Sequence, residues 1–108
     1  MKLKIIKEEK KNLGNIKTKK ITFAPEKNNQ LLTYQQIRDF VDDQKKKLPF
    51  GSKMVVRALN MQRDTNLYSS YSNGWKTDKQ WDDYLSGKAE DVDKFKHFYN
   101  FTIDIQFA

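Results

Sequence analysis

The chain has 108 residues, with 21 Lys and Arg against 14 Asp and Glu, no Cys and one His. That length predicts a single domain spanning residues 1–108. The lack of Cys excludes disulfides and thiolate chemistry, and a single His excludes a His–His metal pair. No apolar stretch approaches the roughly 18 residues of a membrane span. We therefore expect no membrane partner and a cytoplasmic location, which would be the host cytoplasm if the gene is viral.

The positive charge is uneven along the chain. Residues 1–53 carry 14 Lys and Arg against 6 Asp and Glu, a net charge of +8, whereas residues 54–108 carry −1. This asymmetry indicates an anionic partner for the N-terminal half. Only three cations are Arg, and residues of A/T-rich codons dominate the composition. The gene is therefore expected to come from a low-GC bacterium, a phage, a mobile element or a virus, and codon bias would explain part of the Lys excess.

The N-terminal segment predicts a β-hairpin. Residues 2–10 and 16–23 are expected to be strands, because apolar side chains recur in both and β-branched residues fill the second. Asn12, Gly14 and Asn15 provide the turn, since Gly and Asn tolerate positive φ.

The clearest local signal predicts a helix over residues 34–47. Thr33 as N-cap and Gln36 three residues later form a capping box. Apolar side chains then recur at helical spacing, and three lysines at residues 45–47 complement the helix dipole in its last turn. Pro49 and Gly51 are expected to end it.

Four further elements are expected. Residues 53–61 predict a buried strand, residues 66–71 a weaker strand, and residues 78–86 a short helix that begins with a second capping box. Residues 95–107 alternate strictly and predict one long strand, with Phe95, His97, Tyr99, Phe101 and every second residue thereafter on its buried face.

The predicted fold class is α+β, in the order β-β-α-β-(β)-α-β. It is a small antiparallel or mixed sheet with one main helix packed on one face. The C-terminal strand is too long and too apolar for an unprotected edge. We expect it either to be central in its sheet or to pair with a second copy of the chain.

An enzyme is not expected. His97 lies in an aromatic pattern that is typical of a packed strand, and the acidic residues 90–93 are best explained as a solvated loop. The sequence contains no Gly-rich phosphate loop, nucleophile elbow or metal-binding helix motif. We therefore predict no catalytic residue, no metal and no cofactor.

The leading functional hypothesis is a small, basic protein that binds single-stranded nucleic acid without sequence specificity. Lysines of the hairpin would follow the phosphate backbone, and aromatic side chains around residues 68–76 would stack on bases. The candidate binding residues are Lys2, Lys4, Lys7, Lys17, Lys19, Lys20, Arg57, Arg63, Tyr68, Tyr71, Trp75 and Lys76.

Two alternatives stay open beside this hypothesis. The three aromatics Tyr68, Tyr71 and Trp75 could instead cover the edge of the core, and the lysines could form an ordinary solvated face. The chain could also be a protein–protein interaction module, either a self-assembling virion-type subunit or an inhibitor of a host protein. The Trp and Tyr content of the chain and its apolar C-terminal strand favour this protein–protein interaction module.

Overall fold

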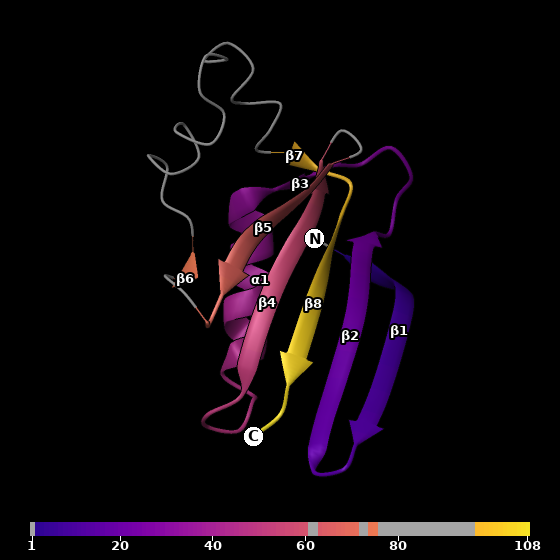
Figure 1. The fold of residues 1–108 in the computed structure, drawn as a ribbon. Helices are drawn as coiled ribbons and strands as arrows, with labels where there is room; N and C mark the ends of the chain where they lie inside the picture. Colours follow the sequence, from indigo (N-terminus) through magenta and orange to yellow (C-terminus); the bar gives the residue numbers. More distant parts are fainter. Residues whose placement is uncertain (1, 61–62, 72–73, 76–96) are drawn as a thin grey trace.

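The computed structural model describes residues 2–60, 63–71, 74–75 and 97–108, which form an antiparallel sheet with one helix against it (Figure 1). Six strands pair in the order β1-β2-β8-β4-β5-β6. They are β1 (Leu3–Leu13), β2 (Ile16–Pro25), β4 (Lys53–Asn60), β5 (Arg63–Ser69), β6 (Gly74–Trp75) and β8 (Asn100–Gln106). The short strands β3 (Leu32–Thr33) and β7 (His97–Phe98) pair separately, and α1 (Tyr34–Lys45) lies behind β4 in Figure 1.

The α+β class predicted from the sequence is wrong, because the protein is largely a β-sheet. Strands account for 59% and helix for 15% of the described part of the chain. Both hairpin strands extend further than predicted, to residues 13 and 25, and α1 ends two residues earlier than predicted, at Lys45. The second helix expected over residues 78–86 lies outside the described residues.

The predicted hairpin is confirmed. β1 and β2 pair from Leu3 opposite Pro25 to Leu13 opposite Ile16, around a two-residue turn. Gly14 in this turn has φ +61°, a conformation that costs other residues energy. A bulge between Ile5 and Lys7 inserts one extra residue into β1.

The predicted N-terminus of α1 is also confirmed. The Thr33 hydroxyl oxygen accepts a hydrogen bond from the Gln36 backbone N–H at 3.1 Å, and the Gln36 side chain accepts one from the Thr33 backbone N–H at 2.9 Å. These two bonds satisfy donors that the first helical turn leaves unpaired.

We expect Thr33→Ala to lower the free energy of unfolding by about 1 kcal/mol, because it removes the acceptor of this capping box. Urea denaturation would measure the change. Thr33→Ser is the matched control, since it keeps the hydroxyl and should leave the urea midpoint close to that of the parent. Equal midpoints for the Ala variant and the parent would contradict a stabilising cap.

The core lies between α1 and the middle of the sheet. β8 is a central strand, with β2 along one edge and β4 along the other. Its Phe101 is fully buried and lies 5.3 Å from the Phe23 ring and 5.6 Å from the Phe40 ring, between centroids. Ile37 and Val41 of α1 are fully buried against the same core.

The C-terminal strand differs from its prediction in one respect. Between β7 and β8 the chain leaves the strand pairing at Tyr99, and Phe98 is fully buried while His97 and Tyr99 are exposed. The inner face was therefore assigned correctly from Phe101 onward and wrongly at His97 and Tyr99. Phe98 instead pairs with Leu32 in the small sheet, and Phe95 lies outside the described residues.

Candidate nucleic-acid interface on the open sheet face

The sheet face turned away from α1 carries six exposed cations among the described residues, and we call it the open face. Cross-strand partners in a sheet point to the same side. Thr102 and Asp104 alternate with the core residues of β8, so they and their partners on β2 and β4 belong to this face. Its cations are Lys4, Lys7, Lys11, Lys20, Lys53 and Arg57.

Most of these cations form no ion pair within the described part of the chain, although three acids, Glu9, Asp64 and Asp104, lie on the same face. Of these six cations, only Lys7 forms an ion pair with another described residue, Glu9, at 3.2 Å between Nζ and Oε1. The hydrogen bond from Lys7 lowers the pKa of Glu9, and the charges of Lys7, Lys11 and Lys20 lower it further. The Glu9 carboxylate therefore lies among three cations of the open face.

A shallow pocket of about 190 Å³ lies over the middle of the open face. Lys20, Arg57 and Thr102 line it, together with Val55, Asp64 and Asp104. Lys20 is opposite Asp104 and Arg57 is opposite Thr102, so the two cations flank β8 diagonally. The pocket thus holds two cations and two carboxylates, from strands that are far apart in sequence.

The aromatic side chain of Tyr71 borders this face. Tyr71 is 59% exposed, its hydroxyl donates to Gln106 Oε1 at 3.2 Å, and Lys53 Nζ lies 5.1 Å from its ring centroid. Gln106 and Lys53 are cross-strand partners on the open face. Of the three aromatic side chains that were predicted to bind nucleic acid, Tyr71 is therefore the one that lies beside a cation of the open face.

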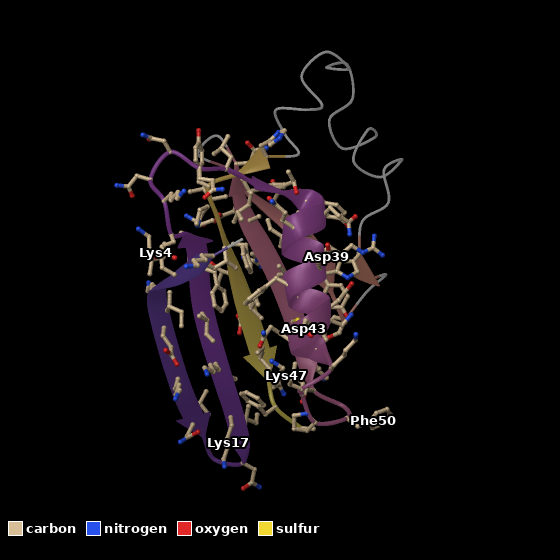
Figure 2. All side chains as sticks on the ribbon, turned by 180° about the vertical axis from the view of Figure 1, so that it is seen from behind. Lys4, Lys17, Asp39, Asp43, Lys47 and Phe50 are labelled. Atoms are coloured by element: carbon tan, nitrogen blue, oxygen red, sulfur yellow. The ribbon has the colours of Figure 1, made fainter. Side chains whose placement is uncertain are left out.

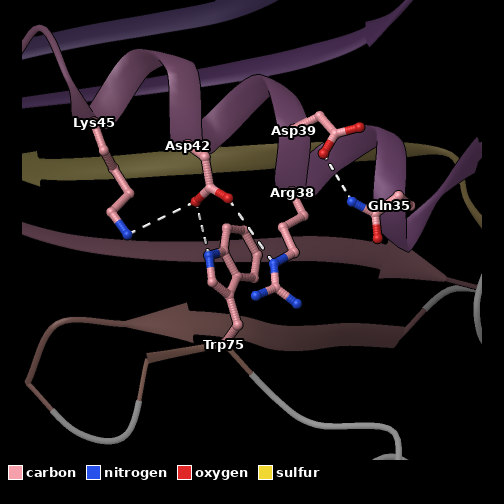
Figure 3. Close-up of polar contacts among 6 residues, drawn as sticks. All are labelled: Gln35, Arg38, Asp39, Asp42, Lys45 and Trp75. Atoms are coloured by element: carbon pink, nitrogen blue, oxygen red, sulfur yellow. Dashed lines mark hydrogen bonds and ion pairs between the residues drawn. The ribbon is translucent and has the colours of Figure 1, made fainter.

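The other two predicted aromatics lie on the opposite side: Figure 3 shows Trp75 against α1, and Tyr68 is the cross-strand partner of the buried Val56. Trp75 Nε1 donates to Asp42 Oδ1 at 2.9 Å, and the Trp75 ring contacts those of Tyr34 and Tyr68. Lys45 Nζ lies 4.2 Å from the Tyr68 ring centroid. Tyr68 and Trp75 thus cover the edge of the core, as the alternative interpretation of these aromatics expected, and are not placed beside Tyr71.

The predicted cations are likewise divided. Lys17 and Lys19 are on the α1 side of β2, where Lys19 pairs with Glu8 at 3.5 Å, and Lys2 lies at the other end of the hairpin beside Glu26. Arg63 is placed only by its backbone pairing with Asn60, and Lys76 lies outside the described residues.

The candidate binding residues did not include Lys11 or Lys53 of the open face, although Lys11 is one of the hairpin lysines that were expected to follow the phosphate backbone. Lys11 shares this face with Lys20, because both are on the side of Thr18 in the hairpin register. Lys53 begins β4 opposite Gln106. The alternation of residues along each strand could have revealed Lys11, but Lys53 required the pairing of β4 with β8.

The described residues contain no group of three His, Cys, Asp or Glu side chains placed to hold a metal ion. In the same residues, no helix is long and apolar enough to cross a membrane. The acidic residues 90–93 lie outside the described part. No protein-family model, curated protein or solved structure matches the chain, so its function has to be inferred from its own side chains.

Proposed function

We propose that the open face binds single-stranded nucleic acid through its phosphate backbone, without sequence specificity. The observation that carries this proposal is the placement of six exposed cations on one sheet face, five of them without an ion pair among the described residues. Neutralising backbone phosphates releases condensed counterions, which favours binding whatever the sequence.

The shape of the open face favours a single strand over a duplex. Its cations extend from β1 across β2 and β8 to β4, a width of roughly 15 Å at about 4.8 Å per strand spacing. The helix that could enter a major groove lies on the opposite face of the sheet. Tyr71 at the border supplies a ring on which an unpaired base can stack.

We expect Lys20→Glu with Arg57→Glu to weaken oligonucleotide binding at least about tenfold and to flatten its salt dependence. Each lost phosphate contact reduces the slope of log K against log salt by about 0.7 for a single strand. Fluorescence anisotropy with labelled oligo(dT) and oligo(U) at several salt concentrations would measure both effects.

The matched control is Lys17→Glu with Lys46→Glu, which changes the net charge equally. Both lysines are exposed, and neither is on the open face. This variant should bind oligonucleotides within about threefold of the parent, because only long-range potential is lost. If both double variants lose oligonucleotide affinity equally, the open face is not the binding surface. If the parent protein binds no oligonucleotide, the proposed function is wrong.

A second candidate, self-association, is favoured by the free edge of the sheet. Both edges of β8 are paired within the chain, so the C-terminal strand offers no edge to a second copy. β1 pairs only with β2 in the described part, and Ile5 and Ile6 on it are half exposed. If two copies pair through β1, light scattering would show a dimer whose fraction rises with protein concentration. The Ile6→Lys variant would then be monomeric.

A further inference from the structure

Two turns of the chain project from the same end of the sheet. Thr18 on β2, Gln106 on β8 and Lys53 on β4 are aligned as cross-strand partners. The hairpin turn at Gly14 and Asn15 lies beyond this row, and so does the loop between α1 and β4. We call the two segments, residues 10–19 and 44–53, the basic tip.

The C-terminal residues connect the two halves of the basic tip. The Phe107 backbone N–H donates to the Lys17 carbonyl oxygen at 2.9 Å. The next N–H along the chain, that of Ala108, donates to Ser52 Oγ at 3.3 Å. In Figure 2, Lys17, Lys47 and Phe50 all lie at this end of the molecule, and Lys4 lies far from it.

The basic tip exposes apolar side chains that contribute nothing to the core. Phe50 is fully exposed between Pro49 and Gly51. Leu13 and Ile16 are cross-strand partners beside the hairpin turn, and they are 67% and 46% exposed. Folding therefore leaves three large apolar groups in water at the ends of two turns, where binding to a partner would bury them.

The charge of the basic tip is of one sign. Its two segments contain eight lysines and no Asp or Glu. Four of the eight have an acidic partner outside the tip, namely Lys10 and Lys19 with Glu8, Lys45 with Asp42 and Lys47 with Asp43. The other four, Lys11, Lys17, Lys46 and Lys53, have no ion pair among the described residues.

We propose that the basic tip docks on a lipid bilayer that contains anionic headgroups. Phe50, Leu13 and Ile16 would enter the interface between headgroups and acyl chains, and the surrounding lysines would contact the headgroup charges. This changes our expectation of no membrane partner, which rested only on the lack of a spanning segment.

A bilayer fits these residues better than a protein or a nucleic acid does. The apolar side chains stand on two projecting turns, Leu13 and Ile16 on one and Phe50 on the other, so a folded partner would need a separate pocket for each turn. Only one of the three is aromatic, which is too few for stacking on successive bases. A bilayer surface engages both turns at once, because they end at the same level of the sheet.

Sedimentation with vesicles tests this proposal. The parent should bind phosphatidylcholine vesicles that contain about 30% phosphatidylserine, and should bind vesicles of phosphatidylcholine alone much more weakly. Phe50→Ser should weaken binding to the anionic vesicles at least about tenfold, because the ring no longer enters the interface. Its thermal midpoint should equal that of the parent, since Phe50 makes no core contact.

The two charge-reversal double variants should behave in the opposite way with vesicles to the way they behave with oligonucleotides. Lys17→Glu with Lys46→Glu should lose vesicle binding roughly tenfold or more, whereas Lys20→Glu with Arg57→Glu should retain it within about threefold. The proposal is overturned if the parent ignores anionic vesicles, or if a folded Phe50→Ser variant binds them as tightly as the parent. It is also overturned if Phe50→Ser reduces oligonucleotide binding and not vesicle binding. The vesicle experiments test this proposal by themselves, so a failure of the oligonucleotide experiments would not contradict it.

Discussion

Phe101→Ala should lower the free energy of unfolding by about 3–5 kcal/mol, the range measured for large-to-small changes of buried aromatic residues. Phe101 is fully buried on the central strand β8, and its ring contacts those of Phe23 and Phe40. Alanine would leave a cavity between two sheet strands and the helix, which paired strands cannot easily close. Urea denaturation followed by circular dichroism would measure the loss.

Phe50→Ala is the matched control, because it removes the same ring from a fully exposed position. It should leave the urea midpoint unchanged, since its ring is solvated in both the folded and the unfolded state. A loss below about 1 kcal/mol for the Phe101 variant would mean that the three phenylalanine rings do not form the centre of the core.

Elements defined by local chemistry could be predicted from the sequence. The hairpin turn needs only Gly14 and its flanking residues, and the start of α1 needs only Thr33, Gln36 and the apolar spacing that follows. Each of these signals lies within a few residues of the structure that it specifies. The pairing partners of the strands have no such local signal, because register depends on contacts between distant segments.

The error in the C-terminal strand shows how a regular pattern misleads. Phe98 and Phe101 are both buried, although a continuous strand would place them on opposite faces. The chain accommodates both by leaving the strand at Tyr99, whose N–H donates to the Leu59 carbonyl oxygen. Aromatic residues occur on both faces of the predicted strand, so alternation alone could not reveal this break.

The residue types of the candidate interface could be predicted, but not which of these residues share one face of the sheet. The abundance of hairpin lysines was visible, but which of them share a face depends on the β1–β2 register and on the bulge after Ile5. Trp75 was expected to stack on a base, which requires an exposed ring. Its hydrogen-bond partner, Asp42, is 33 residues away on the helix, a contact that no local pattern indicates.

Ile103→Lys should unfold the protein at 25 °C. Ile103 is 2% exposed on β8, between Ile21 of β2 and Val56 of β4, and it faces the core beneath α1. An ammonium group there would have to lose its hydration or its proton, either of which costs several kcal/mol. Since small domains are stable by only about 5–15 kcal/mol, and the isoleucine contacts are lost as well, little stability would remain. Circular dichroism and a thermal scan would show the loss.

The adjacent substitution Asp104→Lys tests whether the face, and not the strand, decides this outcome. Asp104 is exposed on the open face opposite Lys20, and it has no ion pair among the described residues. The variant should stay folded, because its new side chain remains in water on the other side of the same strand. It should also bind oligonucleotides more tightly than the parent, since it replaces an acid with a cation beside Lys20 and Arg57. A folded Ile103→Lys protein with an unchanged thermal midpoint would contradict the inner face assigned to β8, and an unfolded Asp104→Lys protein would contradict the open one.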